Sequence, residues 1–467
     1  MEYSKDLDLS IFKSYDFRGI YPTQINEQAM NLIAQAYLKF LSEKIGKPIK
    51  ELSIAICSDA RISSKPLLDE AIKIFLRYGV TIYDLGLLSI NDYYFAVGKY
   101  KYNGGFMATA SHNPPEYGGC KLAYSNLQYA DSIDFVSGKE LLQYMKDLDF
   151  PISDEQTDGK IIKKDIIEDH VAHVLSFVDT KKVKPLKVVI DIGNGMNGKM
   201  MKEILNKLSC QATFIFTDPD GNFPNRPPNP LTKGASDKLA IKIKELGADL
   251  GFICDVDGDR INLLDEQGTF YKGDMTMLPM VKAILDKNPG AGIVYNLIAS
   301  HSVKDLINKW GGKAIRSEVG YMNLARHMRE EGGIMSGEVS AHFAFKDNYY
   351  ADSAFIAMVL SLEAISQDGR PVSEIIKEYT LYHKSEELNF VVEDRDLEMA
   401  KFRNEYGENI LDEIDGITVE FSDWWFNVRP SGTEPLLRLT VEAKSKKTLD
   451  DKIKELESLI DFKERKQ

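Results

Sequence analysis

The chain has 467 residues, of which 43% are hydrophobic and 28% are charged, a balance typical of soluble globular proteins with several buried cores. At about 150 residues per domain, this length predicts three or four domains. The formal net charge of −13 argues against a nucleic-acid-binding protein, and the sequence has no apolar run of the roughly 18 residues that a membrane-spanning helix needs.

The N-terminal region has no basic-then-apolar signal pattern, so we expect a cytoplasmic protein. A helix is predicted there, capped by Asn26 and ended by Gly46. Apolar residues at helical spacing indicate that one face of this helix is buried. That face consists of Met30, Ile33, Tyr37, Leu38 and Leu41.

A strand, a polar loop, a helix and a second strand follow one another in three parts of the chain, 52–85, 187–216 and 292–316. Such alternation predicts parallel sheets with right-handed crossovers. The copies lie too far apart for a solenoid, so they favour three related α/β domains, with a single large α/β domain as the alternative. The expected elements are 52–57, 66–78 and 80–85, then 187–192, a helix to 208 and 212–216, then 292–296, a helix through 310 and 313–316.

The C-terminal region has a different pattern. Alternating apolar residues at 417–421 and 437–441 predict two half-buried strands that flank the segment 429–435. A final helix is expected to follow, with Leu449, Ile453, Leu456 and Ile460 on one face. These elements indicate a small α+β domain.

The segment 109–115, Thr-Ala-Ser-His-Asn-Pro-Pro, follows an apolar run that ends at Ala108. A small polar loop that leaves a buried strand lies where α/β folds bind ligands. Ser111 is the candidate nucleophile or phosphate carrier, and His112 or Lys121 could supply a base or a positive field. The alternative is a turn whose side chains only satisfy backbone groups.

Asp255, Asp257 and Asp259 alternate in the segment that follows the apolar residues 250–254. Because neighbouring carboxylates repel one another, the trio predicts a divalent cation, and oxygen ligands favour Mg²⁺. Gly258 stands at the fourth position of the segment, which argues against an EF-hand loop. Two alternatives remain, a phosphatase of the haloacid-dehalogenase type with Asp255 as nucleophile and an acidic surface turn.

Two further polar segments are candidates for substrate binding. In 337–342, Glu338 and Ser340 are spaced for two sugar hydroxyls, and His342 could move a proton near neutral pH. The segment 429–435, with Arg438 beyond it, offers guanidinium, hydroxyl and backbone N–H donors to one oxyanion, which is typical of a phosphate site. The alternatives are a structural histidine and an ordinary hairpin turn.

Five segments, in this order along the chain, resemble the signatures of the α-D-phosphohexomutase family, most like its bacterial phosphomannomutase/phosphoglucomutase members. Their ranges are 15–19, 109–114, 255–260, 337–342 and 429–435, and the segment 219–225 resembles the linker before the family's metal loop. The resemblance implies three mixed or parallel-sheet α/β domains and a C-terminal α+β domain in a heart-shaped arrangement. The expected domains are 1–155 with the phosphoserine loop, 156–265 with the metal loop, 266–375 with the sugar loop and 376–467 with the phosphate loop.

The resemblance also implies a role for each matching residue. Ser111 would be the phosphoserine and, with the three aspartates, a ligand of one Mg²⁺ per chain. Lys121 matches a general acid/base, and Arg18 and Arg260 match arginines near the transferred phosphoryl group. The residues expected to bind the substrate are Tyr15, Glu338, Ser340, Arg429, Ser431, Gly432, Thr433 and Arg438.

The implied enzyme is an isomerase that interconverts hexose 1-phosphate and hexose 6-phosphate, of mannose, glucose or both, through phosphoserine and a hexose 1,6-bisphosphate. Glu318 and Tyr321 stand where dual-specificity members often have lysine and histidine, which leaves the preferred sugar open. The alternatives are a phosphoglucosamine or phosphopentose mutase, a non-catalytic sugar-phosphate-binding protein and a phosphatase. We expect a monomer or homodimer with a small sugar phosphate as its partner, and no nucleic-acid or membrane partner.

Overall fold

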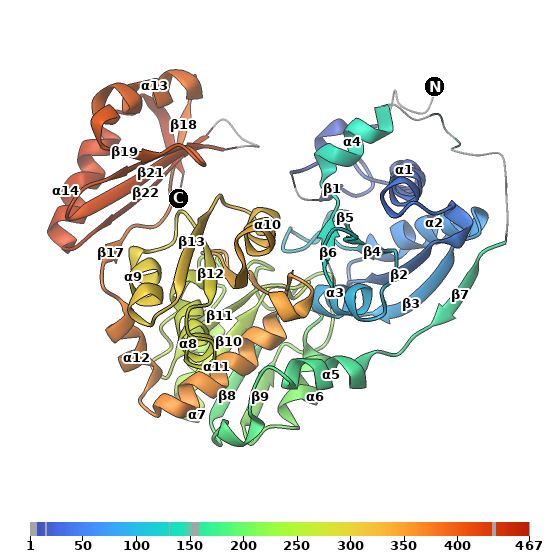
Figure 1. Cartoon of the computed structure of the whole chain (residues 1–467), viewed down its shortest axis with the longest axis horizontal. Helices are drawn as coiled ribbons and strands as arrows, with labels where there is room; N and C mark the ends of the chain where they lie inside the picture. The colour runs from blue at the N-terminus through green and yellow to red at the C-terminus, as the bar shows by residue number, and fades with distance from the viewer. Residues whose placement is uncertain are drawn as a thin grey trace.

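The structure is a computed structural model that describes residues 7–14, 16–129, 131–146, 149, 151, 158–431 and 436–466. The strands of these residues form four sheets, arranged along the chain in the order of the colours in Figure 1. The three α/β sheets and the C-terminal α+β sheet confirm the predicted fold class. No helix within the described ranges is both long and apolar enough to cross a membrane.

The first sheet has the strand order β1-β5-β4-β2-β3-β7, with β6 paired to β5. Strands β2, β3, β4 and β7 run parallel, whereas β5 is antiparallel to β4 and β1. The sheet is therefore mixed rather than purely parallel. Its strands are β1 (Phe17–Ile20), β2 (Ser53–Ser58), β3 (Thr81–Leu87), β4 (Gly104–Ala108), β5 (Tyr117–Ser125), β6 (Ile133–Phe135) and β7 (Lys160–Lys163), and its helices are α1 (Glu27–Ile45), α2 (Ser64–Arg77), α3 (Ile90–Lys99) and α4 (Gly138–Lys146).

Helix α1 begins and ends where the sequence predicts. The Asn26 side chain accepts a hydrogen bond from the Ala29 N–H, which satisfies one of the free donors of the first turn. Gly46 ends the helix with a φ of 71°, a conformation that glycine adopts without a steric penalty. All five residues of the predicted apolar face are buried, which confirms that this face of α1 belongs to the core.

The second and third sheets share one hydrophobic core that extends from Val171 to Tyr379. Their strand orders are β11-β10-β8-β9 and β13-β12-β14-β15-β16. The second unit contains α5 (Ile167–Leu175), β8 (Lys187–Asp191), α6 (Gly198–Leu205), β9 (Gln211–Ile215), α7 (Asp237–Leu246), β10 (Leu250–Cys254) and β11 (Ile261–Asp265). The third contains α8 (Gly273–Lys287), β12 (Gly292–Asn296), α9 (His301–Lys309), β13 (Lys313–Ser317), α10 (Tyr321–Glu331), β14 (Gly333–Gly337), β15 (Phe343–Phe345), β16 (Ala351–Asp352), α11 (Ala354–Asp368) and α12 (Val372–Tyr379).

The fourth sheet is antiparallel, has its own core and lies at the upper left of Figure 1. Its order is β19-β20-β21-β22-β18-β23, with β17 paired to β22. Arg316 donates to Asp412 and, over 2.9 Å, to the Thr418 hydroxyl, which joins this sheet to the third one. The elements are β17 (His383–Lys384), β18 (Leu388–Val392), α13 (Arg395–Tyr406), β19 (Ile410–Asp412), β20 (Ile417–Glu420), β21 (Trp424–Pro430), β22 (Leu436–Ala443), α14 (Lys446–Glu457) and β23 (Phe462–Lys466).

The C-terminal prediction was wrong in two details. An additional strand, β21, lies between the two predicted ones, because the chain reverses in a tight turn in which the Phe421 N–H donates to the Trp424 carbonyl over 2.9 Å. Arg429 therefore belongs to a strand and not to a loop. Ile460 is buried as expected, but it lies beyond the end of α14 at Glu457.

The four expected domain ranges stay a proposal. The expected boundary after residue 375 falls inside α12 (Val372–Tyr379), and a helix does not divide between two domains. We therefore propose that the last boundary follows this helix.

Candidate functional site

The Ser111 loop leaves the carboxyl end of β4, at an edge of the sheet where α/β folds bind ligands. Ser111 is completely buried and has a φ of 52°, in the left-handed region that serine rarely occupies. Its N–H donates to the Thr109 hydroxyl oxygen over 2.9 Å. A strained backbone held by specific contacts is typical of functional sites, because the surrounding structure must stabilise it.

An Asp59–Arg61 pair supports this loop from the end of β2. The Asp59 carboxylate accepts from the Thr109 hydroxyl over 2.7 Å and from Arg61 Nε over 3.2 Å. The Arg61 guanidinium donates to the carbonyls of Ser111 over 2.5 Å, Asn113 over 2.6 Å and Pro114 over 2.7 Å. This pair was not predicted from the sequence, although it directly follows β2, a strand that is parallel to β4 and ends at the same edge.

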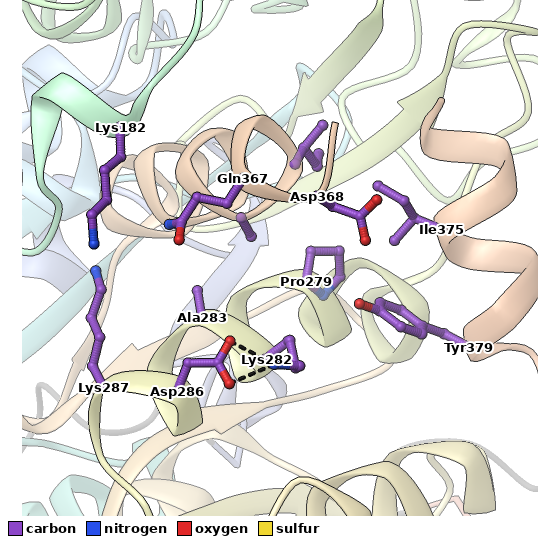
Figure 2. A pocket seen from close by; sticks show the side chains of 12 residues that line it. Lys182, Pro279, Lys282, Ala283, Asp286, Lys287, Gln367, Asp368, Ile375 and Tyr379 are labelled. Carbon is purple, nitrogen blue, oxygen red and sulfur yellow. Dashed lines mark hydrogen bonds and ion pairs between the residues drawn. The ribbon is translucent and has the colours of Figure 1, made fainter. Parts of the chain in front are cut away.

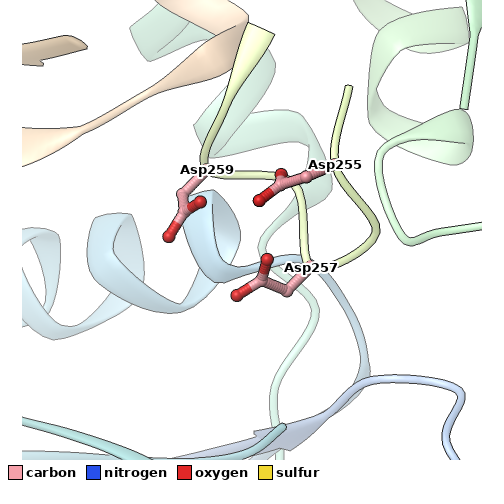
Figure 3. Close-up of side chains that lie close together, drawn as sticks. All are labelled: Asp255, Asp257 and Asp259. Carbon is pink, nitrogen blue, oxygen red and sulfur yellow. The ribbon is translucent and has the colours of Figure 1, made fainter. Parts of the chain in front are cut away.

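The three predicted aspartates lie on one tight loop between β10 and β11 (Figure 3). All three side chains are buried, and one carboxylate oxygen from each lies within 4.8 Å of those of the others. Ser111 Oγ donates to Asp257 Oδ1 over 3.1 Å, which brings the first and second predicted segments together. A hydroxyl and three carboxylates from distant parts of the chain thus face one buried space.

Lys121 lies against the same carboxylates and donates to Asp257 over 2.8 Å and to Asp259 over 2.6 Å. Burial alone lowers the pKa of a lysine, but here the charges of the two aspartates raise the pKa of Lys121 above its usual range. Burial raises the pKa of Asp255 well above the usual value, and the charges of Asp259 and Asp257 raise it further. Burial also acts to raise the pKa of Asp259, but Lys121 and His342 hold that pKa well below the usual value.

The donor set fits a divalent cation. Asp255 Oδ2 and Asp259 Oδ1 are buried and make no hydrogen bond within the described part of the chain. Buried carboxylate oxygens normally have partners, so their free lone pairs favour a ligand. Clustered carboxylate oxygens suit hard ions such as Mg²⁺.

Arginines and a histidine surround the serine and the carboxylates. Arg18 donates to Asp16 and, over 2.7 Å, to the Asn113 side-chain oxygen, which directs it toward the Ser111 loop. Arg260 Nε lies 3.6 Å from Asp255 Oδ2. His112 Nδ1 lies 3.2 Å from Ser111 Oγ, and burial together with the nearby arginines lowers the pKa of His112 well below its usual value. His112 is therefore a neutral hydrogen-bond partner of the serine.

The segment 337–342 follows β14 and meets the aspartate loop. Glu338 Oε1 accepts from the Gly320 N–H over 2.8 Å, and the Ser340 hydroxyl lies 3.2 Å from Glu338 Oε2 and 2.9 Å from His342 Nδ1. His342 Nε2 lies 3.4 Å from Asp259 Oδ1. Burial lowers the pKa of His342, but the Asp259 charge outweighs this effect and raises the pKa to about 10. This pKa favours the protonated form of His342, and the proton-transfer role expected from the sequence stays a prediction.

Glu318 and Tyr321 have partners of their own. Glu318 accepts from Arg326 over 3.1 Å and lies 2.9 Å from His327 Nε2. The Tyr321 ring stacks on His342, with ring centroids 5.9 Å apart. Glu318 is thus paired with Arg326 and His327 of α10, and Tyr321 presents an aromatic surface next to the segment 337–342.

The fourth predicted segment forms a separate cluster on the C-terminal sheet. Arg429 and Arg438 face each other across β21 and β22, and Glu387 lies 2.8 Å from the first and 3.4 Å from the second. The Ser431 carbonyl accepts from Arg395 over 2.5 Å. Gly432 and Thr433, like Tyr15, lie outside the described residues. The structure therefore brings Arg18 of the segment 15–19 together with the segments 109–114, 255–260 and 337–342, and leaves the described residues of 429–435 on the C-terminal sheet.

A cavity of about 340 Å³ lies elsewhere, among α8, α11 and α12. Figure 2 shows that its charged residues come from several elements and that Lys282 is bound to Asp286, at 2.5 Å. None of the predicted site residues lines it. The predicted site residues therefore lie at the serine and aspartate loops and not at this cavity.

Comparisons with known proteins agree with this arrangement. Residues 9–135, 168–268 and 272–382 match the phosphoglucomutase/phosphomannomutase alpha/beta/alpha domains I, II and III, and residues 387–458 match the C-terminal domain of the same enzymes. A phosphomannomutase of Methanocaldococcus jannaschii is 36% identical over 97% of this chain and 98% of its own. A phosphomannomutase of Escherichia coli K12 is 32% identical over 93% of this chain and 95% of its own. A crystal structure of a phosphoglucomutase/phosphomannomutase family protein from Burkholderia thailandensis has a TM-score of 0.84 and 26% identity, and covers 97% of both chains.

Proposed function

The chain belongs to the phosphoglucomutase/phosphomannomutase family of mutases, and we propose that it interconverts the 1-phosphate and 6-phosphate of mannose, of glucose or of both. The observation that carries the proposal is the buried Ser111 hydroxyl, 3.1 Å from a carboxylate of the aspartate trio and surrounded by Lys121, Arg18 and Arg260. A hydroxyl among fixed cations and metal-binding carboxylates suits the storage and transfer of a phosphoryl group.

Asp255, Asp257, Asp259 and an oxygen of the Ser111 group would hold one Mg²⁺. When bound, this ion would neutralise charge on the transferred phosphoryl group. Asp255 Oδ2 and Asp259 Oδ1 support this assignment, because neither makes a hydrogen bond within the described residues and their cationic neighbours, Arg260 and His342, lie 3.6 Å and 3.4 Å away.

The reaction itself is two phosphoryl transfers. In the first, the P–O bond to Ser111 breaks, a P–O bond to a sugar hydroxyl forms, and the proton that the sugar hydroxyl loses ends on the Ser111 oxygen, while Lys121 stays a cation. The product is a hexose 1,6-bisphosphate. After it turns end for end, the second transfer returns its other phosphoryl group to Ser111. Phosphate monoesters are inert, so the rate depends on the positive field of Arg18, Arg260 and Lys121.

Sugar recognition is assigned to Glu338 and Ser340, which lie 3.2 Å apart beside the aspartate loop. Their oxygens can bind two neighbouring hydroxyls of one hexose ring. The names of the two relatives, both phosphomannomutases, favour mannose phosphate as a substrate. Tyr321 stands where dual-specificity members often have a histidine, so at this position an aromatic ring and not a cation would contact the sugar.

The second phosphate would bind at Arg429, Ser431, Gly432, Thr433 and Arg438. Two facing arginines form a site for an anion, and the phosphate would replace Glu387 as their partner. The turning of the bisphosphate requires this second anion site, because one end must be held while the other leaves the serine. Closure of the C-terminal sheet over the sugar loop would also keep water from the phosphoserine.

Turnover of a panel of sugar phosphates tests the proposal. The purified protein is given the 1-phosphates of mannose, glucose, N-acetylglucosamine, glucosamine and ribose with Mg²⁺ and glucose 1,6-bisphosphate, and products are separated by chromatography. We expect isomerised mannose or glucose 6-phosphate. Release of inorganic phosphate would favour a phosphatase, turnover of glucosamine or pentose phosphates alone would move the protein to another mutase, and binding without turnover would leave a sugar-phosphate-binding protein.

A further inference from the structure

The N-terminus of α3 contacts the aspartate loop, although the two are far apart in the sequence. The Ile90 N–H donates to the Asp257 carbonyl over 3.0 Å, and Asn91 Nδ2 donates to the Gly258 carbonyl over 2.6 Å. Asn91 is 1% exposed. Gly258 lies between two of the candidate ligands, so Asn91 binds the backbone at the centre of the metal site without itself being a ligand.

The same side chain also contacts the third sheet unit. Asn91 Oδ1 accepts from the N–H of Ala354, the first residue of α11, over 2.9 Å. The Gly258 carbonyl can bind only the NH₂ end of the Asn91 amide, and the Ala354 N–H can bind only its oxygen. The two bonds therefore fix the Asn91 amide in one orientation. One buried amide therefore joins α3 of the first unit, the aspartate loop of the second and α11 of the third.

A second asparagine completes the contact. Asn197 Nδ2 donates to the Gly258 carbonyl over 3.0 Å, and its Oδ1 accepts from Asn91 Nδ2 over 3.2 Å. Gly258 has a φ of 94°, and a Cβ built there would lie 2.1 Å from Asn197 Oδ1. Gly258 thus has a backbone conformation that only glycine adopts easily. The side-chain amides of Asn91 and Asn197 hold it there, because both donate to the Gly258 carbonyl.

We propose that Asn91 is a positioning residue for the metal, which holds Asp257 and Asp259 in their converging orientation by fixing the Gly258 peptide. The inference rests on the proposed function only in that the aspartate trio binds a divalent cation. Partners that orient metal ligands typically change metal affinity about 10-fold to 100-fold when they are removed. Without the amide, the Gly258 carbonyl loses its shortest bond and the two flanking carboxylates lose their common orientation.

Direct binding of Mn²⁺ tests this inference without using activity. The dissociation constant is measured by titration calorimetry and by electron paramagnetic resonance on the wild type and on Asn91→Ala. We expect the Kd to rise about tenfold or more. Asn91→Ser, which keeps a small polar side chain but is too short to make both bonds, provides a second variant if Asn91→Ala does not fold.

The matched control is Asn103→Ala. Asn103 is also a buried asparagine of the first sheet unit, but its side chain accepts from the Ser53 N–H over 3.0 Å, away from the aspartate loop. We expect this variant to lose thermal stability while the Mn²⁺ Kd stays within twofold of the wild-type value. Equal Kd values for Asn91→Ala and the wild type, or an equal rise for Asn103→Ala, would overturn the positioning role. A wild type that binds no Mn²⁺ would contradict the proposed metal site itself, and the inference with it.

Discussion

At the scale of single residues, the proposed reactive site consists of Ser111 and the aspartate trio. A serine hydroxyl has a high pKa and is a weak nucleophile, so its surroundings must supply the charge that phosphoryl transfer needs. Lys121 is buried and lies 2.8 Å from Asp257 and 2.6 Å from Asp259. In such a low-dielectric space each charge acts more strongly than it would in water, and an unpaired one is costly.

Asp257→Asn is expected to lower the turnover of sugar phosphate about 100-fold or more, since it removes a ligand that also contacts Ser111 and Lys121. The measurement is steady-state kinetics over a range of Mg²⁺ concentrations. The same variant should lose the rise in melting temperature that Mg²⁺ gives the wild type by binding the folded state.

Asp286→Asn is the control for this experiment, because Asp286 is paired with Lys282 beside the cavity of Figure 2. It should keep both the rate and the response to Mg²⁺. Normal Mg²⁺ dependence of the Asp257→Asn enzyme would show that Asp257 is not a ligand of the metal.

At the scale of elements, the site depends on loops that leave the carboxyl ends of parallel strands. The loops after β2, β4, β10 and β14 carry Asp59, Ser111, Asp255 and Glu338. The Asp59–Arg61 pair braces the Ser111 loop through three carbonyls, and the Arg61 side chain is completely buried. The loop conformation is therefore determined by a neighbouring strand and not by its own sequence.

Arg61→Ala is expected to lower the free energy of unfolding by about 3–5 kcal/mol, because it leaves Asp59 buried without its charged partner. It should also lower kcat more than it raises KM for the sugar phosphate, since the braced loop carries the reacting serine and not the sugar contacts. Chemical denaturation and initial rates measure the two effects.

Arg329→Ala breaks another pair, 3.3 Å from Asp134, with a side chain that is 5% exposed. This control should lose stability with a much smaller change in kcat. If both variants lose activity in proportion to stability, Arg61 has only a structural role.

Much of this architecture could be predicted from the sequence, because strand, loop and helix signals are local. The capping of α1 by Asn26 and the strand 292–296 are examples, and the latter matches β12 residue for residue. The extra strand β21 was missed because its apolar run, Trp-Trp-Phe, does not alternate with polar residues. The Arg61 and Asn91 contacts could not be predicted, since each joins residues that only the folded chain brings together.

In the whole molecule, the two expected phosphate sites lie on different sheets: one is at the Ser111 and aspartate loops, and the other is at Arg429 and Arg438. Four of the five signature segments meet at or beside the aspartate loop. The described partners of Arg429 and Arg438 are Glu387 and Asp415, which lie on loops of the C-terminal unit. Contacts join this sheet to the third unit on several strands: Arg316 donates to the Thr418 hydroxyl of β20, and the His301 N–H donates to Glu442 of β22 over 2.8 Å. A mutase that turns its substrate needs two such sites in one molecule.

Arg429→Ala is expected to raise KM for the sugar phosphate about 10-fold to 100-fold, the worth of one charged hydrogen bond to phosphate, with a smaller effect on kcat. It should also release hexose 1,6-bisphosphate into solution during turnover, which chromatography of the reaction mixture would detect.

Arg403→Ala removes an exposed arginine of α13, in the same C-terminal unit, bound to Glu413 over 2.7 Å, and should leave both parameters unchanged. Unchanged kinetics for Arg429→Ala would exclude this arginine from the phosphate site.

Detection of phosphate on Ser111 tests the proposed phosphoserine, and with it the proposed function, most directly. The protein is incubated with glucose 1,6-bisphosphate labelled with ³²P, digested with trypsin and analysed by mass spectrometry. We expect label and one added phosphate on the peptide 102–121, localised to Ser111, and none on the Ser111→Ala variant. Label on Asp255, or an active enzyme that carries no phosphate on Ser111, would contradict it.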